Sequence, residues 1–145
     1  MGRRSHPGRG QDGIIAALRG WLADALARGG PALSYGARCE RAAARHLRWR
    51  GYRIVARNFR AAGAEIDLVA LDGDTLVFVE VKARRSLVAG TPEAAVDERK
   101  QHRIRRAAEI FVDRHRARRK PIRFDVVAIT GDGRGRKFEL LRDAF

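Results

Sequence analysis

The sequence predicts an α/β domain, and three observations support that prediction. Helix-like and strand-like segments follow one another in the order helix, helix, three strands, helix, two strands. An Asp-Gly pair at 72–73 separates two apolar, β-branched runs, which is a strong hairpin signal. The 145 residues suit one domain, because a chain of about 150 residues buries roughly 68–70% of its unfolded surface.

Three segments are expected to be helices and five to be strands. The helices are expected at 13–28, 34–50 and 97–118, and the strands at 52–59, 65–71, 75–83, 123–130 and 137–141. Gly29, Gly51 and Pro121 end the three helices, since Gly and Pro interrupt helical hydrogen bonding. Residues 1–33 are therefore expected to form a basic arm with an N-terminal helical extension, and residues 34–145 the folded domain.

The charge of the chain indicates a phosphate-rich partner. Lys and Arg number 31 against 17 Asp and Glu, a net charge of +14. Arg suits bidentate phosphate contacts, although a coding bias would also enrich Arg. The single Cys39 excludes a disulfide framework and a Cys-rich zinc site within one chain. No apolar stretch is long enough to span a membrane and no signal peptide is evident, so a cytoplasmic location is expected.

The predicted hairpin at 65–83 carries the most informative residues. Because side chains alternate along a strand, Asp67 shares a face with Glu65, and Glu80 shares a face with Lys82. A loop at either 73–74 or 72–73 puts Asp67 opposite or diagonal to Glu80, on the same face. A three-residue loop without a bulge would separate the two carboxylates.

Burying these acids together requires compensation. Two carboxylates about 4 Å apart repel by roughly 4 kcal/mol at an effective dielectric constant of 20. A hard divalent cation such as Mg²⁺ removes this repulsion and accepts one or two protein carboxylates plus waters. The alternative is an inert ion-pair cluster of Glu65, Asp67, Glu80 and Lys82. The metal site is favoured because only four of the 31 basic residues are Lys, so Lys82 indicates a need for a compact ammonium.

Glu40 is a further candidate on the second helix. It precedes Ala43, Ala44 and Leu47 at the spacing of one helical face, so it lies at the apolar edge and can point toward the sheet. Most helical Glu residues are simply solvated, and this alternative remains open.

The run AEIDLVALDGDTLVFVEVK resembles the hairpin of the restriction-endonuclease-like (PD-(D/E)xK) superfamily, whose pattern is an acid, a spacer and Glu-x-Lys. More closely, residues 36–145 resemble the YraN family of bacterial proteins. The matches are Gly36 to Glu40, Gly51–Tyr52, Asn58, EIDLVA, VFVEVK, Arg84–Arg85, Pro92, Lys100, RFDVVAI and Ala144–Phe145. Ala64 replaces a usual Gly and Ile66 a usual Pro, and neither change removes a metal ligand.

This resemblance implies a restriction-endonuclease-like αβ sandwich, with a central mixed sheet flanked by helices and a metal-dependent nuclease site. Asp67 and Glu80, with the carbonyl of Val81, would hold Mg²⁺ or Mn²⁺, and Glu40 would hold a second metal or reach the first through water. Lys82 would orient the attacking water or stabilise the transition state. The superfamily's products carry a 5′-phosphate.

Residues 99–123 carry 11 Lys and Arg against two acids, so this segment is expected to bind phosphate backbones without reading bases. A solvated surface helix is the alternative. The resemblance places Lys100 and Gln101 at the rim of the cleft. The expected nucleic-acid contacts are Lys100, Gln101, Arg103, Arg105, Arg106, Arg84 and Arg85, and Arg134 and Arg136 could also touch a phosphate.

The sequence leaves three functions to compare. A metal-dependent nuclease acting on DNA leads, because clustered acids have no use in a purely binding surface. A non-cleaving nucleic-acid-binding module of the same fold is the alternative, and an RNA- or ribosome-associated factor fits the charge but not the acids. The substrate form stays open, although cutting both strands of a duplex would call for a homodimer. The 13–28 helix could dock on the domain, on a second copy or on a membrane surface.

Overall fold

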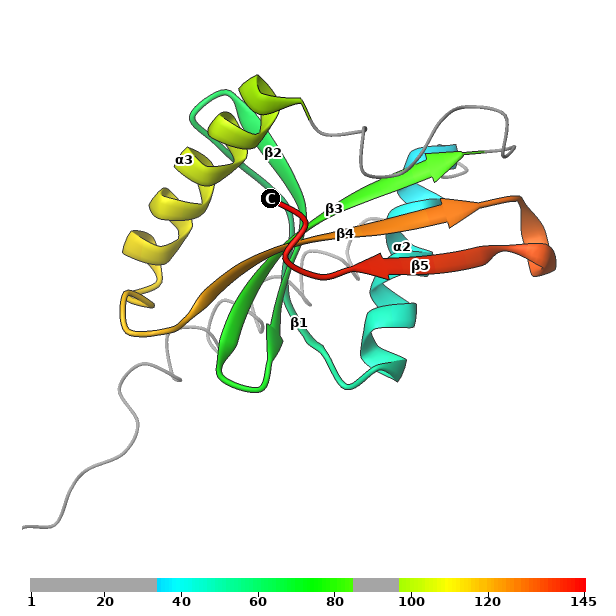
Figure 1. Cartoon of the computed structure of the whole chain (residues 1–145), viewed down its shortest axis with the longest axis horizontal. Coiled ribbons are helices and arrows are strands. Elements are labelled where there is room, and N and C mark those ends of the chain that lie inside the picture. The colour runs from blue at the N-terminus through cyan, green and yellow to red at the C-terminus, as the bar shows by residue number, and fades with distance from the viewer. Residues whose placement is uncertain (1–33, 85–96) are drawn as a thin grey trace, which may run out of the picture.

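The computed structural model describes residues 34–84 and 97–145, which form one sheet and the helices around it (Figure 1). The strands are β1 (Arg53–Ala61), β2 (Ala64–Asp72), β3 (Thr75–Arg84), β4 (Ile122–Thr130) and β5 (Lys137–Leu141). The helices are α2 (Tyr35–Trp49), α3 (Glu98–Arg114) and the short 3₁₀ helix η2 (Gly133–Gly135). The predicted 13–28 helix, the basic arm and Arg85 lie outside the described residues.

The five strands lie in the order β1-β2-β3-β4-β5. Neighbouring strands pair antiparallel except β3 and β4, which are parallel. A parallel pair needs a long crossover, and α3 lies in the connection between these two strands. The predicted α/β architecture with a central mixed sheet is therefore confirmed.

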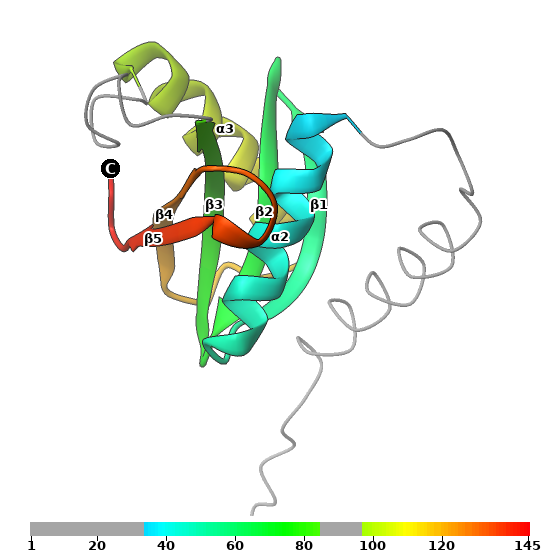
Figure 2. The ribbon, with the colours of Figure 1, turned by 90° about the vertical axis from the view of Figure 1, so that its right-hand side faces the viewer.

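The two long helices cover opposite faces of the sheet (Figure 2). On α2, small buried residues such as Ala43 and Ala44 bring the helix close to the strands, where it packs with Leu68, Val77 and Val127. On α3, the Phe111 ring meets Phe59 and Phe78 edge-on in an aromatic core. Both apolar faces follow the helical spacing predicted from the sequence.

The third helix ends four residues earlier than predicted. Arg116 takes a left-handed φ of 53°, and the Ala117 amide donates to the Val112 carbonyl at 2.9 Å. Together with the bond from the Arg116 amide to the Asp113 carbonyl, this is a Schellman ending. This helix end could not be predicted from the sequence, because its left-handed position is occupied by Arg116 rather than by Gly.

The β2–β3 hairpin settles the register left open by the sequence. Leu68 pairs with Val79 and Asp72 with Thr75, so Gly73 and Asp74 form the two-residue loop. Gly73 has a φ of 59°, as the first position of a tight hairpin turn requires. Asp67 directly precedes Leu68 and Glu80 directly follows Val79, and both side chains line one pocket.

A second tight hairpin joins β1 to β2, where the sequence indicated a longer loop. Ala61 pairs with Ala64, and the loop residues Ala62 and Gly63 have φ values of 51° and 70°. An Ala in a left-handed position carries no turn signal, so both strands were predicted too short. Within the described part of the chain, no helix is long and apolar enough to cross a membrane.

Candidate functional site

Four carboxylates from three elements meet at one pocket of about 350 Å³. Asp67 and Glu65 come from β2, Glu80 from β3 and Glu40 from α2. Lys100 and Arg103 of α3 close the other side of the pocket. The predicted convergence of Asp67, Glu80 and Glu40 is therefore present in the structure. We call this the acid pocket.

The surroundings of Asp67 disfavour its ionised form. Its Oδ2 accepts a hydrogen bond from the Val81 amide at 2.7 Å. Burial and the negative charge of Glu80 nevertheless raise the pKa of Asp67 to about 7, with a smaller contribution from Glu40. Near neutral pH this carboxyl is poised between its two protonation states, and a cation beside it would favour the ionised form.

Two ammonium groups reach Glu80, whose side chain is only 6% exposed. The Lys82 Nζ lies 3.1 Å from the Glu80 Oε1, as expected of a residue on the same face. The Lys100 Nζ contacts the same oxygen from the first turn of α3. Burial lowers the pKa of Lys100, but the hydrogen bond to Glu80 and its charge outweigh burial and raise that pKa. Lys100 was predicted at the rim and instead lies against the central carboxylate.

Asn58 holds the outer carboxylates in place. Its Nδ2 donates to the Glu40 Oε2 at 2.8 Å and to the Glu65 Oε1 at 3.2 Å, which ties α2 to the sheet. Asn58 has a φ of 48°, a left-handed conformation that Asn adopts more readily than most residues. The sequence analysis did not identify Asn58 as a site residue. The available signal was an Asn inside a predicted strand, where Asn is rare.

The donor types of the acid pocket fit a hard divalent cation, because carboxylate oxygens are the ligands that Mg²⁺ prefers. Their present arrangement is not yet a coordination shell: across 34–84 and 97–145, no three Asp, Glu, His or Cys side chains are placed to hold a metal. Glu80 is held by the two lysines, and Glu65 by Arg60 at 2.9 Å. Lys100 would therefore compete with a metal ion for the Glu80 Oε1.

The remaining predicted nucleic-acid contacts are dispersed. Arg103 lines the acid pocket, whereas the guanidinium of Arg105 lies over the Phe124 ring, 5.6 Å from its centre. Arg106 is exposed on α3, and Gln101 and Arg84 are partly buried. Only Lys100 and Arg103 of the predicted α3 contacts therefore line the acid pocket.

The sequence analysis missed a second basic cluster, on α2. Arg38, Arg41, Arg45 and Arg48 line one pocket together with Arg57 and Arg136. Their helical spacing of three, four and three residues puts the first four on one side of α2. That spacing was visible in the sequence, but the density of charge in 99–123 was the stronger signal.

A mixed five-stranded sheet between two helices, with an acid pocket at its second and third strands, is consistent with a nuclease-like αβ fold. The chain belongs to the family described as "Uncharacterised protein family UPF0102", the YraN family, whose profile matches residues 39–129. The matched range includes Glu40, Asp67, Glu80, Lys82 and Lys100.

Relatives share this family description. A UPF0102 protein of Stutzerimonas stutzeri is 44% identical over 113 residues, which is 77% of this chain and 94% of the relative. One from Symbiobacterium thermophilum is 48% identical over 107 residues, covering 73% and 91% of the two chains. One from Rhodococcus opacus is 47% identical over 114 residues, covering 78% and 97%.

Proposed function

We propose that the protein is a metal-dependent nuclease that hydrolyses phosphodiester bonds in DNA at the acid pocket. The observation that carries the proposal is the facing pair of Asp67 and Glu80 beside Lys82 and Lys100. Burial and the charge of Glu80 raise the pKa of Asp67 to about 7, so a bound cation would stabilise its ionised form. Perturbed carboxyl groups in an open pocket are typical of catalytic sites.

Each side chain has a defined task in this proposal. Asp67 and Glu80 would hold Mg²⁺ or Mn²⁺, which supplies a Lewis acid and lowers the pKa of a bound water. Glu40, kept at the pocket by Asn58, would hold a second ion or contact the first through water. Lys82 would orient the attacking water or stabilise charge on the phosphate.

Lys100 has a different role. Its ammonium neutralises Glu80 in the absence of a ligand, and its side chain is one third exposed, so it can swing away. On release, it and Arg103 would face a phosphate that enters the acid pocket. The net charge of +14 would attract that substrate over a longer range.

A non-cleaving nucleic-acid-binding module is the second candidate. The observation that favours it is that Lys82 and Lys100 already satisfy Glu80, as an inert ion-pair cluster would. In that case the acid pocket would be a structural remnant inside a basic protein.

The test is a cleavage assay on single-stranded, duplex and branched DNA with Mg²⁺, Mn²⁺ or EDTA. We expect the parent to cleave with metal, and Glu80→Gln and Asp67→Asn to lower the rate by roughly 100-fold or more. Glu139→Gln is the matched control, since Glu139 is an exposed acid on β5 and loses the same charge.

Cleavage that survives EDTA or Glu80→Gln would refute the proposed site. Binding of all three DNA forms without cleavage under any metal would support the binding module instead.

A further inference from the structure

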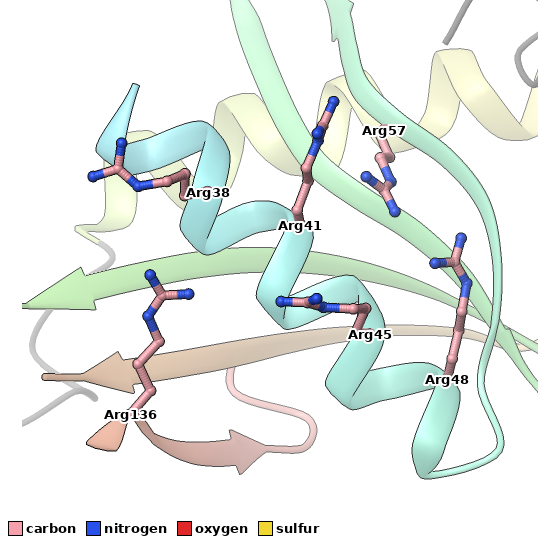
Figure 3. Close-up of a pocket in the computed structure, with 6 residues that line it drawn as sticks. All are labelled: Arg38, Arg41, Arg45, Arg48, Arg57 and Arg136. Carbon is pink, nitrogen blue, oxygen red and sulfur yellow. The ribbon is translucent and has the colours of Figure 1, made fainter. Parts of the chain in front are cut away.

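The second pocket, on the α2 side of the sheet, is lined by six arginines among the described residues (Figure 3). It has a volume of about 350 Å³. Its six residues, which we call the arginine face, are Arg38, Arg41, Arg45, Arg48, Arg57 and Arg136. Arg57 comes from β1 and Arg136 from the residue just before β5, so three parts of the chain contribute.

The fold creates this cluster by packing the other side of α2. Cys39, Ala43 and Leu47 are buried against the sheet, which leaves the arginine positions directed outward. In Figure 3, Arg41 and Arg48 extend from α2 toward Arg57. The cluster is therefore a consequence of helical spacing and of the neighbouring edge strand.

Among the described residues, Asp132 and Glu40 offset part of the charge of the arginine face. Asp132 accepts a weak hydrogen bond from Arg136 at 3.4 Å, and the Arg136 Nε is buried with no hydrogen-bond partner in the described part of the chain. Burial, together with the charges of Arg48 and Arg41, lowers the pKa of Arg57, and Glu40 only partly offsets this. The pocket thus holds like charges that an anion would stabilise.

An exposed aromatic residue lies beside these charges. Trp49 is 92% exposed and follows Arg45 by four residues, which places both on the same side of α2. Such an indole offers a flat apolar surface on which a base can stack. A lone phosphate would use neither the full set of six guanidiniums nor the indole.

We propose that the arginine face binds a single-stranded segment of nucleic acid, with guanidiniums on successive phosphates and Trp49 stacked on a base. Guanidinium groups bind phosphate oxygens in pairs, which favours Arg for this task. Unpaired bases are available for stacking, whereas the bases of a duplex are not.

The arginine face leads toward the acid pocket. Arg41 follows Glu40 in α2 and Arg57 precedes Asn58 in β1, and Glu40 and Asn58 hydrogen-bond to each other. A strand held at Arg41 and Arg57 would thus continue to the rim of the acid pocket. This step alone rests on the proposed nuclease function, while the binding itself does not require cleavage.

The experiment uses Trp49 as its own reporter. Trp21 is the other tryptophan of the chain, so Trp21→Phe leaves Trp49 as the single source of indole fluorescence. The full-length protein is titrated in EDTA with 12-nucleotide oligo(dT) and oligo(U), with a duplex of equal length and with inorganic polyphosphate. We expect both single strands to quench Trp49, and polyphosphate to bind without quenching it.

Two sets of double variants are compared, and each removes two positive charges, from α2 or from α3. Arg41→Gln/Arg45→Gln should lower the affinity for oligo(dT) at least tenfold and reduce the slope of log K against log salt by about 1.4, or about 0.7 for each lost contact. Arg99→Gln/Arg114→Gln removes the same charge from exposed positions on α3 that are not among the expected nucleic-acid contacts, and it should leave the affinity and the salt slope nearly unchanged. Arg38→Gln/Arg48→Gln provides an independent pair on the arginine face.

The outcomes separate this proposal from the nuclease. Loss of binding in the α3 pair but not in either α2 pair, or binding without a change in Trp49 emission, would overturn the proposal. So would a duplex that binds as tightly as oligo(dT). Binding is measured in EDTA, which removes the metal that cleavage would need, so failure of cleavage would leave the arginine face intact, and failure here would leave the acid pocket intact.

Discussion

Two buried carboxylates on neighbouring parallel strands have opposite surroundings. Glu80 on β3 is 6% exposed and Asp125 on β4 is 0% exposed, and they are the buried charged residues of the described chain. The register pairs Glu80 with Val126 and Val79 with Asp125, so the two acids point to opposite faces of the sheet. Both acids are buried to a similar degree, so they differ mainly in the charged and polar groups that contact them.

Both carboxylate oxygens of Asp125 accept hydrogen bonds, and an arginine balances its charge. The Arg123 Nε and Nη2 donate to its two oxygens at 2.8 and 2.9 Å, and the Asp143 amide donates at 3.0 Å. The hydrogen bond to Asp125 in turn raises the pKa of Arg123. This arrangement joins β4 to Asp143 around a carboxylate that is fully buried, as a structural ion pair does.

Glu80 instead faces a second carboxylate across an open pocket. Its cationic partners are two long, partly exposed lysines rather than one bidentate guanidinium. Burial and the charge of Glu80 together raise the pKa of Asp67 to about 7. Burial of an acid therefore does not indicate function by itself, whereas a second, poorly matched acid beside an open pocket does.

The largest expected effect tests the matched acid. Asp125→Ala should lower the free energy of unfolding by about 3–5 kcal/mol, because Arg123 loses its bidentate partner in a largely buried position. Urea unfolding at pH 7 measures this. Asp74→Ala is the control, since Asp74 is 93% exposed and 3.7 Å from its Lys partner, and its urea midpoint should not move. Equal midpoints for the two variants would remove the structural role of Asp125.

The fold was predictable from the sequence because its signals are local. The Asp-Gly signal predicted a two-residue loop, and with such a loop Asp67, Glu80 and Lys82 share one face; the structure has the loop at Gly73 and Asp74. What failed was the detail at left-handed positions occupied by Ala62 and Arg116, since neither residue type signals that conformation.

The site was predictable only in its centre. Asn58 reaches Glu40 because the strand departs from regular geometry there, which alternation rules cannot anticipate. Lys100 reaches Glu80 across a gap of 20 residues through tertiary packing. The arginine face was not predicted although its spacing is visible in the sequence, because the continuous charge of residues 99–123 is a stronger signal than arginines spaced three or four residues apart.

The second prediction concerns the pH dependence of the mismatched pair. With a folded pKa of about 7 against an ordinary 3.8, the folded state retains the Asp67 proton that the unfolded state loses first. Stability should therefore fall by roughly 2–4 kcal/mol as pH rises from about 4 to about 7, and then level off. Urea unfolding of the parent and of Asp67→Asn across this range gives the difference. Parallel curves for the two proteins would mean that Asp67 titrates normally.

The third prediction is that a bound divalent metal restores the stability that the folded state loses when Asp67 ionises. Mg²⁺ needs the ionised carboxylates, so its affinity should rise as pH passes through about 7. At ten times its dissociation constant, bound Mg²⁺ would stabilise the parent by about 1.4 kcal/mol and leave Asp67→Asn unchanged. Thermal unfolding at pH 8, with and without Mg²⁺, is the measurement. An equal shift in both proteins would place the ion elsewhere.

The smallest expected change is for Glu80→Gln without metal, and it is the most discriminating. The substitution removes the repulsion with Asp67, which stabilises the fold, and weakens the contacts with Lys82 and Lys100, which destabilises it. Both lysines are partly exposed and can hydrate, so the two effects nearly cancel and stability in EDTA should stay within about 1 kcal/mol of the parent.

The same substitution should return the pKa of Asp67 toward its ordinary value and abolish the stabilisation by Mg²⁺, because one ligand and one repelling charge are lost together. Glu139→Gln should change neither. Melting curves of both variants in EDTA and in Mg²⁺ provide the measurement. Suppose instead that Glu80→Gln lost as much stability as Asp125→Ala, and that Mg²⁺ did not change the melting temperature of the parent. Glu80 and Asp125 would then both be structural ion-pair residues. The acid pocket would then be an inert ion-pair cluster, since only a matched pair is so damaged by losing one member.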